Sequence, residues 1–277
     1  MLNFSNRPEL RHLSALVAAF RAVAGDAPFF LAGATARDLL LHYAHGINVG
    51  RDTRDVDIAL MVSDWPTYEA LRSRLIAGGQ FAPNGNALHQ LKFGGFLEID
   101  LIPFGAVERA DRTIAWPLDG DFVMTVFGFR EVFDATLVVR LPDNEEIRVV
   151  SLPALAVLKL MAWKERRLSA PGKDAHDLAM ILRNYLDAGN HERLYTDAAH
   201  LLEMPAFDFE QAGAWLLGND MAQLLPRVAR SPVAKILNEE SNPQGAVRLV
   251  GDMPIEAGLA LALLQSVNKG FLENMER

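Results

Sequence analysis

The chain has 277 residues, half of them apolar, and a formal net charge of −8 at pH 7. This length and apolar fraction predict a folded protein with one large domain or two ordinary ones. Because the chain has no cysteine, disulfides, a thiolate nucleophile and a zinc or iron–sulfur site built on sulfur are excluded, and the acidic charge does not favour a long nucleic-acid duplex lying across the surface.

The N-terminus and the apolar runs carry no targeting signal. Residues 1–10 lack the basic segment, apolar core and small-residue cleavage site of a secretory signal. No apolar run reaches about 18 residues without a charged residue, as a membrane-spanning helix would require. We therefore expect a cytoplasmic protein with no membrane partner.

The first 150 residues alternate between helical and strand patterns. Apolar spacing predicts helices over residues 8–24, 35–46 and 63–79. Strands are expected at 28–32 and 55–62, as a hairpin formed by 87–93 and 96–104, and at 122–127, 136–141 and 146–150. We predict an α+β domain over residues 1–150, in which a mixed, mainly antiparallel sheet has helices packed on one face.

The pattern of apolar residues changes at residue 151. Five segments between residues 151 and 277 have apolar residues at helical spacing, and none alternates as a half-buried strand does. The region of Pro153 is the most natural boundary. We predict an all-helical domain over residues 151–277.

Aspartates interrupt two of the predicted strands. Asp55 and Asp57 are two residues apart in TRDVDIALMV, so their side chains share one face of the strand. Asp100 lies in FLEIDLIPF with Glu98 on the same face, and the carboxylates converge if the two strands are neighbours. Carboxylates held close together repel, and Mg²⁺ binds carboxylates together with substrate phosphates. The pattern therefore predicts a metal–phosphate site.

A structural role is the alternative for this pair. Asp55 and Asp57 could lie at the exposed start of a strand and form ion pairs with Arg51 and Arg54. The upstream sequence LAGATARD favours the metal site, because a strand, a glycine turn and a helix start present backbone N–H groups and the positive end of a helix dipole to an anion. Gly33 would allow close approach of a phosphate, and Thr35 would cap the helix or contact that phosphate.

Together, GAT, TRDVDIAL and EIDL resemble the signature of the DNA polymerase β-like nucleotidyltransferase superfamily. GATA, TRDVD, LKLMAW and KDAHDL are more closely similar to the AbiEii/AbiGii-type nucleotidyltransferase toxins of bacterial abortive-infection systems, in which Gly-Gly-Thr-Ala, Ser-x-Asp-x-Asp, a helix lysine and a downstream aspartate recur. The resemblance covers roughly residues 28–190. It implies a nucleotidyltransferase-like fold whose helical domain completes the cleft for nucleotide and acceptor.

The resemblance implies roles for residues of the first domain. Asp55 and Asp57 would bind catalytic Mg²⁺, or Mn²⁺ as the alternative metal, and Asp100 or Glu98 would be the third metal ligand. The triphosphate would be lined by Gly33, Ala34, Thr35 and Thr53. Ala34 replaces the family's second glycine or serine, which removes a hydroxyl contact with the phosphate.

The resemblance also implies that Lys159 contacts phosphate and that Asp174 or Asp177 supports the site from the helical domain. Alternatives remain open from the residues themselves. Lys159 could extend its charge past the core to solvent, and Asp174 could cap a helix. Asp177 could orient Lys159 or Lys173.

Arg37 and the basic segment from Lys159 to Lys173 complete the candidate nucleotide site. Arg37 can reach a carboxylate or phosphate, or form a salt bridge with Asp38 or Asp57. The basic segment could be an ordinary solvated helix end, or it could hold a nucleotide through Lys173 or the phosphates of an RNA end.

These observations predict a Mg²⁺-dependent nucleotidyltransferase that uses an NTP such as ATP. The acceptor would be a tRNA 3′ end, a protein hydroxyl or a small molecule, and the resemblance implies a toxin with a cognate antitoxin. The alternative is a catalytically inactive member of the fold that binds a nucleotide or a partner. A metal-dependent phosphohydrolase is disfavoured, because the histidines form no metal-binding motif.

Overall fold

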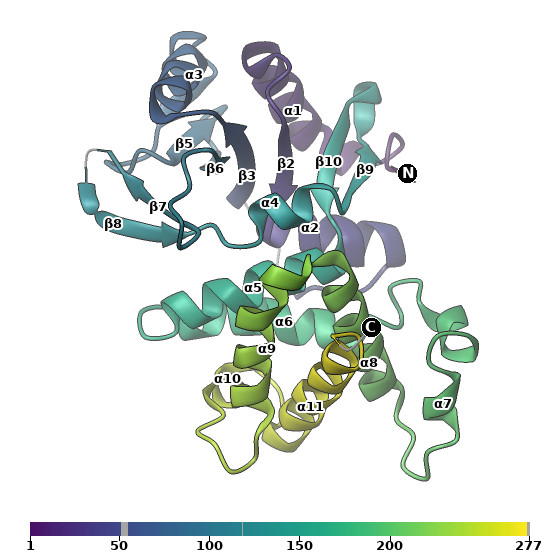
Figure 1. Ribbon diagram of the computed structural model, residues 1–277. Coiled ribbons are helices and arrows are strands. Elements are labelled where there is room, and N and C mark those ends of the chain that lie inside the picture. The colour runs from purple at the N-terminus through teal and green to yellow at the C-terminus, as the bar shows by residue number, and fades with distance from the viewer. Residues whose placement is uncertain (51–54, 118, 276–277) are drawn as a thin grey trace. The chain divides into compact units, whose positions relative to one another are not determined.

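The computed structural model describes residues 1–50, 55–117 and 119–275, and the chain forms two compact units (Figure 1). The first unit comprises Met1–Ala36 and Arg51–Ser151, and the second comprises Arg37–Gly50 and Leu152–Arg277. The segment Arg37–Gly50, which we placed in the first domain, therefore belongs to the second unit. The buried Arg37 side chain explains this assignment, because its ion-pair partners Asp38 and Asp177 both belong to the second unit.

A mixed sheet of eight strands forms the centre of the first unit, in the order β1-β9-β10-β2-β3-β6-β5-β4. Four neighbouring pairs are antiparallel, and the pairs β1/β9, β2/β10 and β3/β6 are parallel. The strands are β1 (Leu2–Asn3), β2 (Phe29–Ala32), β3 (Asp55–Val62), β4 (Phe81–Pro83), β5 (Gln90–Phe93), β6 (Leu97–Gly105), β9 (Thr136–Arg140) and β10 (Glu146–Val150). The predicted mixed sheet is confirmed.

Two further strands, β7 (Thr113–Trp116) and β8 (Asp119–Thr125), pair with each other outside the main sheet. The hairpin predicted around Gly94 is confirmed as β5 and β6, which pair antiparallel. The short strands β1, β4 and β7 were not predicted.

Helices cover both faces of the sheet. The helices are α1 (Arg11–Ala24), which follows η1 (Pro8–Leu10), then α3 (Trp65–Ala77) and α4 (Phe129–Phe133), with a short turn at η3 (Pro142–Asn144). Phe29 and Phe30 are consecutive residues of β2, so their side chains point to opposite faces. Phe20 of α1 contacts Phe29, whereas Phe129 and Phe133 of α4 contact Phe30. The expectation that helices pack on one face only is therefore wrong.

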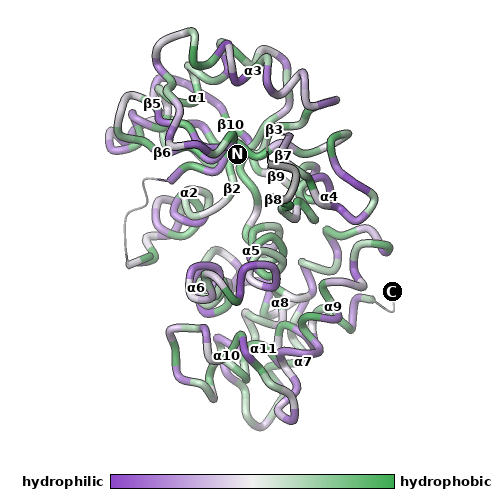
Figure 2. Tube along the Cα trace, turned by 90° about the vertical axis from the view of Figure 1, so that its left-hand side faces the viewer, coloured by the Kyte–Doolittle hydropathy of each residue, from purple (hydrophilic) through white to green (hydrophobic). Residues whose placement is uncertain are grey.

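The described residues of the second unit form helices joined by loops and contain no strand, as predicted for residues 151–277. It contains η2 (Leu39–Tyr43), α5 (Leu152–Arg166), α6 (Pro171–Asn184), η4 (His191–Tyr195), α7 (Ala199–Leu202), α8 (Phe209–Leu224), α9 (Arg227–Ser241), α10 (Arg248–Asp252) and α11 (Ala257–Glu273). Helix α5 is mainly apolar along its length (Figure 2), which agrees with its burial. No helix in the described residues is long and apolar enough to cross a membrane.

Glycines allow α8 and α11 to pack closely. A Cβ atom added to Gly218 of α8 would lie 2.0 Å from the Val267 carbonyl oxygen, and one added to Gly270 of α11 would lie 2.0 Å from that of Trp215. Any larger side chain would therefore force the two helices apart.

Candidate active site

The glycine turn after β2 lies directly against one of the predicted metal ligands. Strand β2 ends at Ala32, which pairs with Asp57 of β3. The next residue, Gly33, has φ +64°, and a Cβ atom there would lie 1.6 Å from Asp57 Oδ2. Only glycine leaves room for this carboxylate, because a positive φ and the absence of Cβ are both required.

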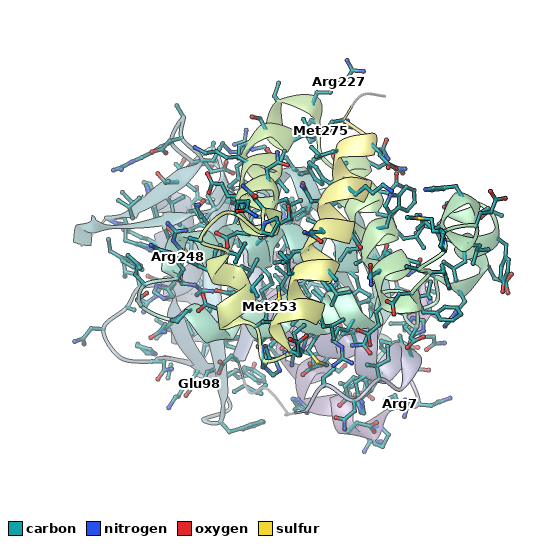
Figure 3. All side chains as sticks on the ribbon, turned by 90° about the horizontal axis from the view of Figure 1, so that it is seen from below. Arg7, Glu98, Arg227, Arg248, Met253 and Met275 are labelled. Carbon is teal, nitrogen blue, oxygen red and sulfur yellow. The ribbon has the colours of Figure 1, made fainter. Side chains whose placement is uncertain are left out.

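The predicted acidic residues are brought together by the parallel pairing of β3 and β6. Asp57 is in register with Asp100, and Asp55 is in register with Glu98. Neighbouring strands lie roughly 5 Å apart, and residues in register point to the same face. The side chains of Asp55, Asp57 and Asp100 are partly exposed, and Glu98 is exposed at the periphery of the unit (Figure 3). The expected neighbourhood of the two acidic strands is confirmed.

These carboxylates share the face of the sheet that carries α4. Ala32, the register partner of Asp57, lies two residues from Phe30, so their side chains point the same way. Phe30 contacts α4 through Phe129 and Phe133. The acidic cluster therefore lies at the end of the strands, next to packed aromatic side chains on the same face of the sheet. This packing holds the strands that carry the carboxylates in place.

Thr35 connects the glycine turn to the start of β3. Its side chain is buried, and its hydroxyl donates a hydrogen bond of 2.9 Å to the Asp55 carbonyl oxygen. This bond fixes the position of the backbone that carries Asp55. Ala34 is also buried. This role of Thr35 was not predicted, and the contacts of Thr35 and Ala34 with a triphosphate stay predictions.

The donor atoms of the acidic cluster fit a hard divalent cation. Asp55 and Asp57 offer carboxylate oxygens, which Mg²⁺ prefers, and their partial exposure leaves room for water and phosphate ligands. Among the described residues, no three His, Asp or Glu side chains are placed so that they could together hold one metal ion. The residues therefore fit a cation held by the aspartate pair and by substrate oxygens rather than a closed protein cage.

A second cluster of charges lies inside the helical unit, on α2 (Gly33–Asp38), α5 and α6. Lys159 Nζ lies 2.5 Å from Asp177 Oδ2 and 3.4 Å from Asp174 Oδ1. Arg37 forms ion pairs with Asp177 and Asp38, and Arg166 Nη2 lies 2.7 Å from Asp174 Oδ2. Asp174 and Asp177 are fully buried, so these pairs bridge α5 and α6 in a region of low dielectric constant.

The pKa of Asp177 is set by opposing effects. Burial raises the pKa of this carboxyl. The nearby charges of Lys159 and Arg37 and their hydrogen bonds together lower the pKa by more than burial raises it, so the pKa lies below its ordinary value. Asp177 therefore carries a negative charge at neutral pH, and this charge stabilises the buried positive charges of Lys159 and Arg37.

The structure decides between several alternatives for this cluster. Asp174 does not cap α6, because the N-cap residue is Ala170 and no side chain caps the helix; Asp174 binds Arg166 and Lys159 instead. Asp177 contacts Lys159, as one alternative predicted, and the salt bridge of Arg37 with Asp38 is confirmed. Arg166 was not among the predicted site residues, although its place in the basic segment was a signal for it.

The remaining predicted site residues are placed as follows. Lys173 is exposed near the start of α6. Thr53, Arg51 and Arg54 lie outside the described residues, so the phosphate contact of Thr53 and the strand-start ion pairs stay predictions.

Comparison with known proteins identifies the family of the chain. Residues 14–231 match the family described as nucleotidyl transferase AbiEii toxin of type IV TA systems. No curated protein matches the sequence. The solved structures that are similar to the chain include the following two. One is an antigenic nucleotidyltransferase-like protein from Paracoccidioides brasiliensis, with 14% identity, a TM-score of 0.43, and coverage of 72% of this chain and 89% of that one. The other is the antibiotic-resistance factor ANT(2'')-Ia, with 11% identity, a TM-score of 0.39, and coverage of 69% and 96%. Because the family match spans most of the sequence and both compact units, the chain belongs to the AbiEii nucleotidyltransferase toxin family.

Proposed function

We propose that the chain is a Mg²⁺-dependent enzyme that transfers a nucleoside monophosphate from an NTP to an acceptor hydroxyl. The acceptor hydroxyl loses its proton to solvent and its oxygen forms a bond with the α-phosphorus, the bond from that phosphorus to the bridging oxygen breaks, and pyrophosphate leaves. The observation that carries this proposal is the close approach of the Asp57 carboxylate to the Gly33 turn, with Asp55 on the same face of β3.

The residues of the first unit have different proposed roles in catalysis. Asp55 and Asp57 would hold Mg²⁺, and Asp100 would support Asp57 from the neighbouring strand. When bound, the metal supplies charge that offsets the developing negative charge on the phosphates. The Gly33 turn presents backbone N–H groups at the start of α2, where an anion is favoured. Thr35 keeps Asp55 in place through its hydrogen bond, so catalysis rests on positioning and electrostatics.

The identity of the acceptor and the toxin role are part of the same proposal. Membership of a toxin family supports transfer to a macromolecule that growth requires, and we propose the 3′ end of tRNA or a protein hydroxyl as the acceptor. A cognate antitoxin is the proposed biological partner. Phosphate contacts by Lys159 and Lys173 and support by Asp174 or Asp177 remain proposals that the family resemblance favours.

Label transfer tests the proposal directly. The purified chain is incubated with Mg²⁺ and each α-³²P-labelled NTP in turn, with total tRNA in one series and protein extract in another. We expect label in one acceptor fraction with the wild type and none with Asp55→Asn or Asp57→Asn, because these changes keep the side-chain size and remove the charge that binds the metal.

Matched variants make the result specific. Asp26→Asn changes an exposed aspartate of the first unit that is not in the acidic cluster, and it should transfer label at the wild-type rate. Asp100→Asn and Glu98→Gln, compared with each other, show which of these two carboxylates of β6 supports the aspartate pair. Nucleotide binding without transfer to any acceptor would favour the inactive alternative, and failure to bind millimolar NTP with Mg²⁺ would overturn the proposal.

A further inference from the structure

An apolar patch is exposed on the helical unit between η4 and the start of α8. Its four large side chains are between 38% and 71% exposed, and they are Tyr195, Leu202, Met204 and Phe209. Figure 1 shows this segment, with α7, at the margin of the unit. Single exposed apolar side chains are common on protein surfaces, but four large ones within fifteen positions concentrate apolar surface on one segment, as interaction sites do.

The patch is held in place by the protein rather than lying on a loose loop. Arg193 donates two hydrogen bonds to Asp220 of α8, of 2.6 and 2.7 Å, and Tyr185 donates to the same carboxylate. Leu194, Ala198 and Leu201 are buried and attach the segment to the core. A surface that is already fixed loses little conformational entropy when a partner binds, which favours its use in recognition.

A small cavity adjoins the patch and shares Met204 with it. It has a volume of about 90 Å³, and its lining includes Met204, Phe207 and Trp215. The rings of Phe207 and Phe209 meet edge to face with centroids 4.8 Å apart, which links the patch to the cavity lining. The cavity has room for roughly three water molecules by volume, which suits one aliphatic side chain of a partner.

Acidic residues outnumber basic ones around the patch. Between positions 185 and 211, Arg193 is the only lysine or arginine of the sequence, and it forms ion pairs with Asp220 and Asp197. Lys269 of α11 is a further cation at the cavity. The acidic residues of the same stretch are Asp187, Glu192, Asp197, Glu203, Asp208 and Glu210. Five of them, Asp187, Glu192, Asp197, Glu203 and Asp208, are exposed. An apolar surface with an acidic rim attracts a positively charged partner and repels nucleic acid and anionic membranes.

We propose that this patch docks a basic amphipathic helix of a separate protein, with one aliphatic side chain inserted between Met204, Phe207 and Trp215. Such a helix presents apolar residues at i, i+3, i+4 and i+7 and lysine or arginine at its flanks, which matches the apolar centre and the acidic rim. The docking surface is independent of the proposed nucleotidyl transfer, so either proposal can fail without the other.

Fluorescence anisotropy with a defined peptide tests the docking surface. The probe is a fluorescein-labelled leucine–lysine peptide of about four helical turns, with its leucines at i, i+3, i+4 and i+7. We expect saturable binding to the full chain that weakens as salt is added. The double variant Met204→Ser/Phe209→Ser should raise the Kd by about tenfold or more, and Glu192→Gln/Glu203→Gln should raise it by a smaller factor.

The controls separate this surface from other causes. Phe96→Ser removes an equally exposed phenylalanine of the first unit and should leave the Kd unchanged. A leucine–glutamate peptide of the same pattern, and a leucine–lysine peptide with its leucines spread around the helix, should bind at least about tenfold more weakly. The proposal is overturned if the probe does not bind, if the double variant binds it as tightly as the wild type, or if either control peptide binds equally well. It is also overturned if light scattering shows a wild-type dimer that the double variant loses, because the patch would then be covered by a second copy.

Discussion

The substitution Gly33→Ala tests whether the glycine turn exists to admit the Asp57 carboxylate. The new Cβ atom would lie 1.6 Å from Asp57 Oδ2, whereas non-bonded atoms in contact are about 3.5 Å apart, so the carboxylate must move by about 2 Å or the turn must open. The positive φ of +64° adds about 1–2 kcal/mol of strain for any residue with a Cβ atom, and the collision adds about 1–3 kcal/mol. We expect the free energy of unfolding to fall by about 2–5 kcal/mol. Nucleotidyl transfer should fall by about a hundredfold or more, because a displacement of about 1 Å in a catalytic group has an effect of that size.

Urea unfolding and α-³²P label transfer measure the two effects. The matched control is Gly79→Ala, since Gly79 has φ +76° but nothing lies within 4 Å of an added Cβ atom. This control should lose only the strain energy and keep full transfer activity. If Gly33→Ala were as active as the control, the geometry of the turn would not position Asp57 for catalysis.

Three further predictions concern stability and the metal. Gly270→Ala should lower the free energy of unfolding by about 1–3 kcal/mol or more in urea unfolding, because its Cβ atom would meet the Trp215 carbonyl oxygen at 2.0 Å; the control Gly251→Ala, in an open helical position, should be neutral or slightly stabilising. Asp177→Asn should cost up to about 3–5 kcal/mol at pH 7, because it removes the carboxylate that the buried charges of Lys159 and Arg37 share and leaves them only Asp174 and Asp38. The folded-state pKa of Asp177 is lowered, so its stabilising contribution is present above the unfolded value of about 3.9 and is lost as the pH falls below it. Urea unfolding of the wild type and of Asp177→Asn should therefore converge at acidic pH, and a constant gap would contradict the ion pairs. Removal of Mg²⁺ with a chelator should abolish label transfer and added Mg²⁺ should restore it, whereas transfer that persists in the chelator would refute the metal requirement.

The sequence predicted best where local patterns were long and regular. The apolar run in residues 55–62 identified β3 with its bounds, and the periodicity after residue 151 identified a helical unit. Strands β1, β4 and β7 have only two to four residues, which is too short for a period to be visible. The sequence also did not show that helices cover both faces of the sheet. This arrangement depends on the packing of α4 against β2, which lies about a hundred residues earlier in the chain.

The candidate site was predictable in its residue types and not in its contacts. Gly33 and Asp57 were expected to share a phosphate-binding region, but the contact between the carboxylate and the glycine depends on the pairing of β2 with β3. Arg37 and Asp177 are 140 positions apart in the sequence, so no local pattern could pair them. Thr35 was predicted to contact phosphate because it follows the Gly33 turn. Its hydrogen bond to the Asp55 carbonyl oxygen depends on the folded backbone and could not be predicted from the sequence.

The balance of charges around Lys159 provides a test of its predicted contact with phosphate. Three cations, Arg37, Lys159 and Arg166, face three carboxylates, Asp38, Asp174 and Asp177. Removing Lys159 alone leaves Asp177 with only one partner, so a loss of transfer by Lys159→Met would mix misfolding with a missing phosphate contact. The double variant Lys159→Met/Asp177→Asn removes one charge of each sign, while Arg37 keeps Asp38 and Arg166 keeps Asp174. We expect it to regain most of the stability that either single variant loses, because no buried charge is left without a partner. If this folded double variant still fails to transfer label, a catalytic role for the Lys159–Asp177 pair is supported, whereas wild-type transfer would make the pair structural.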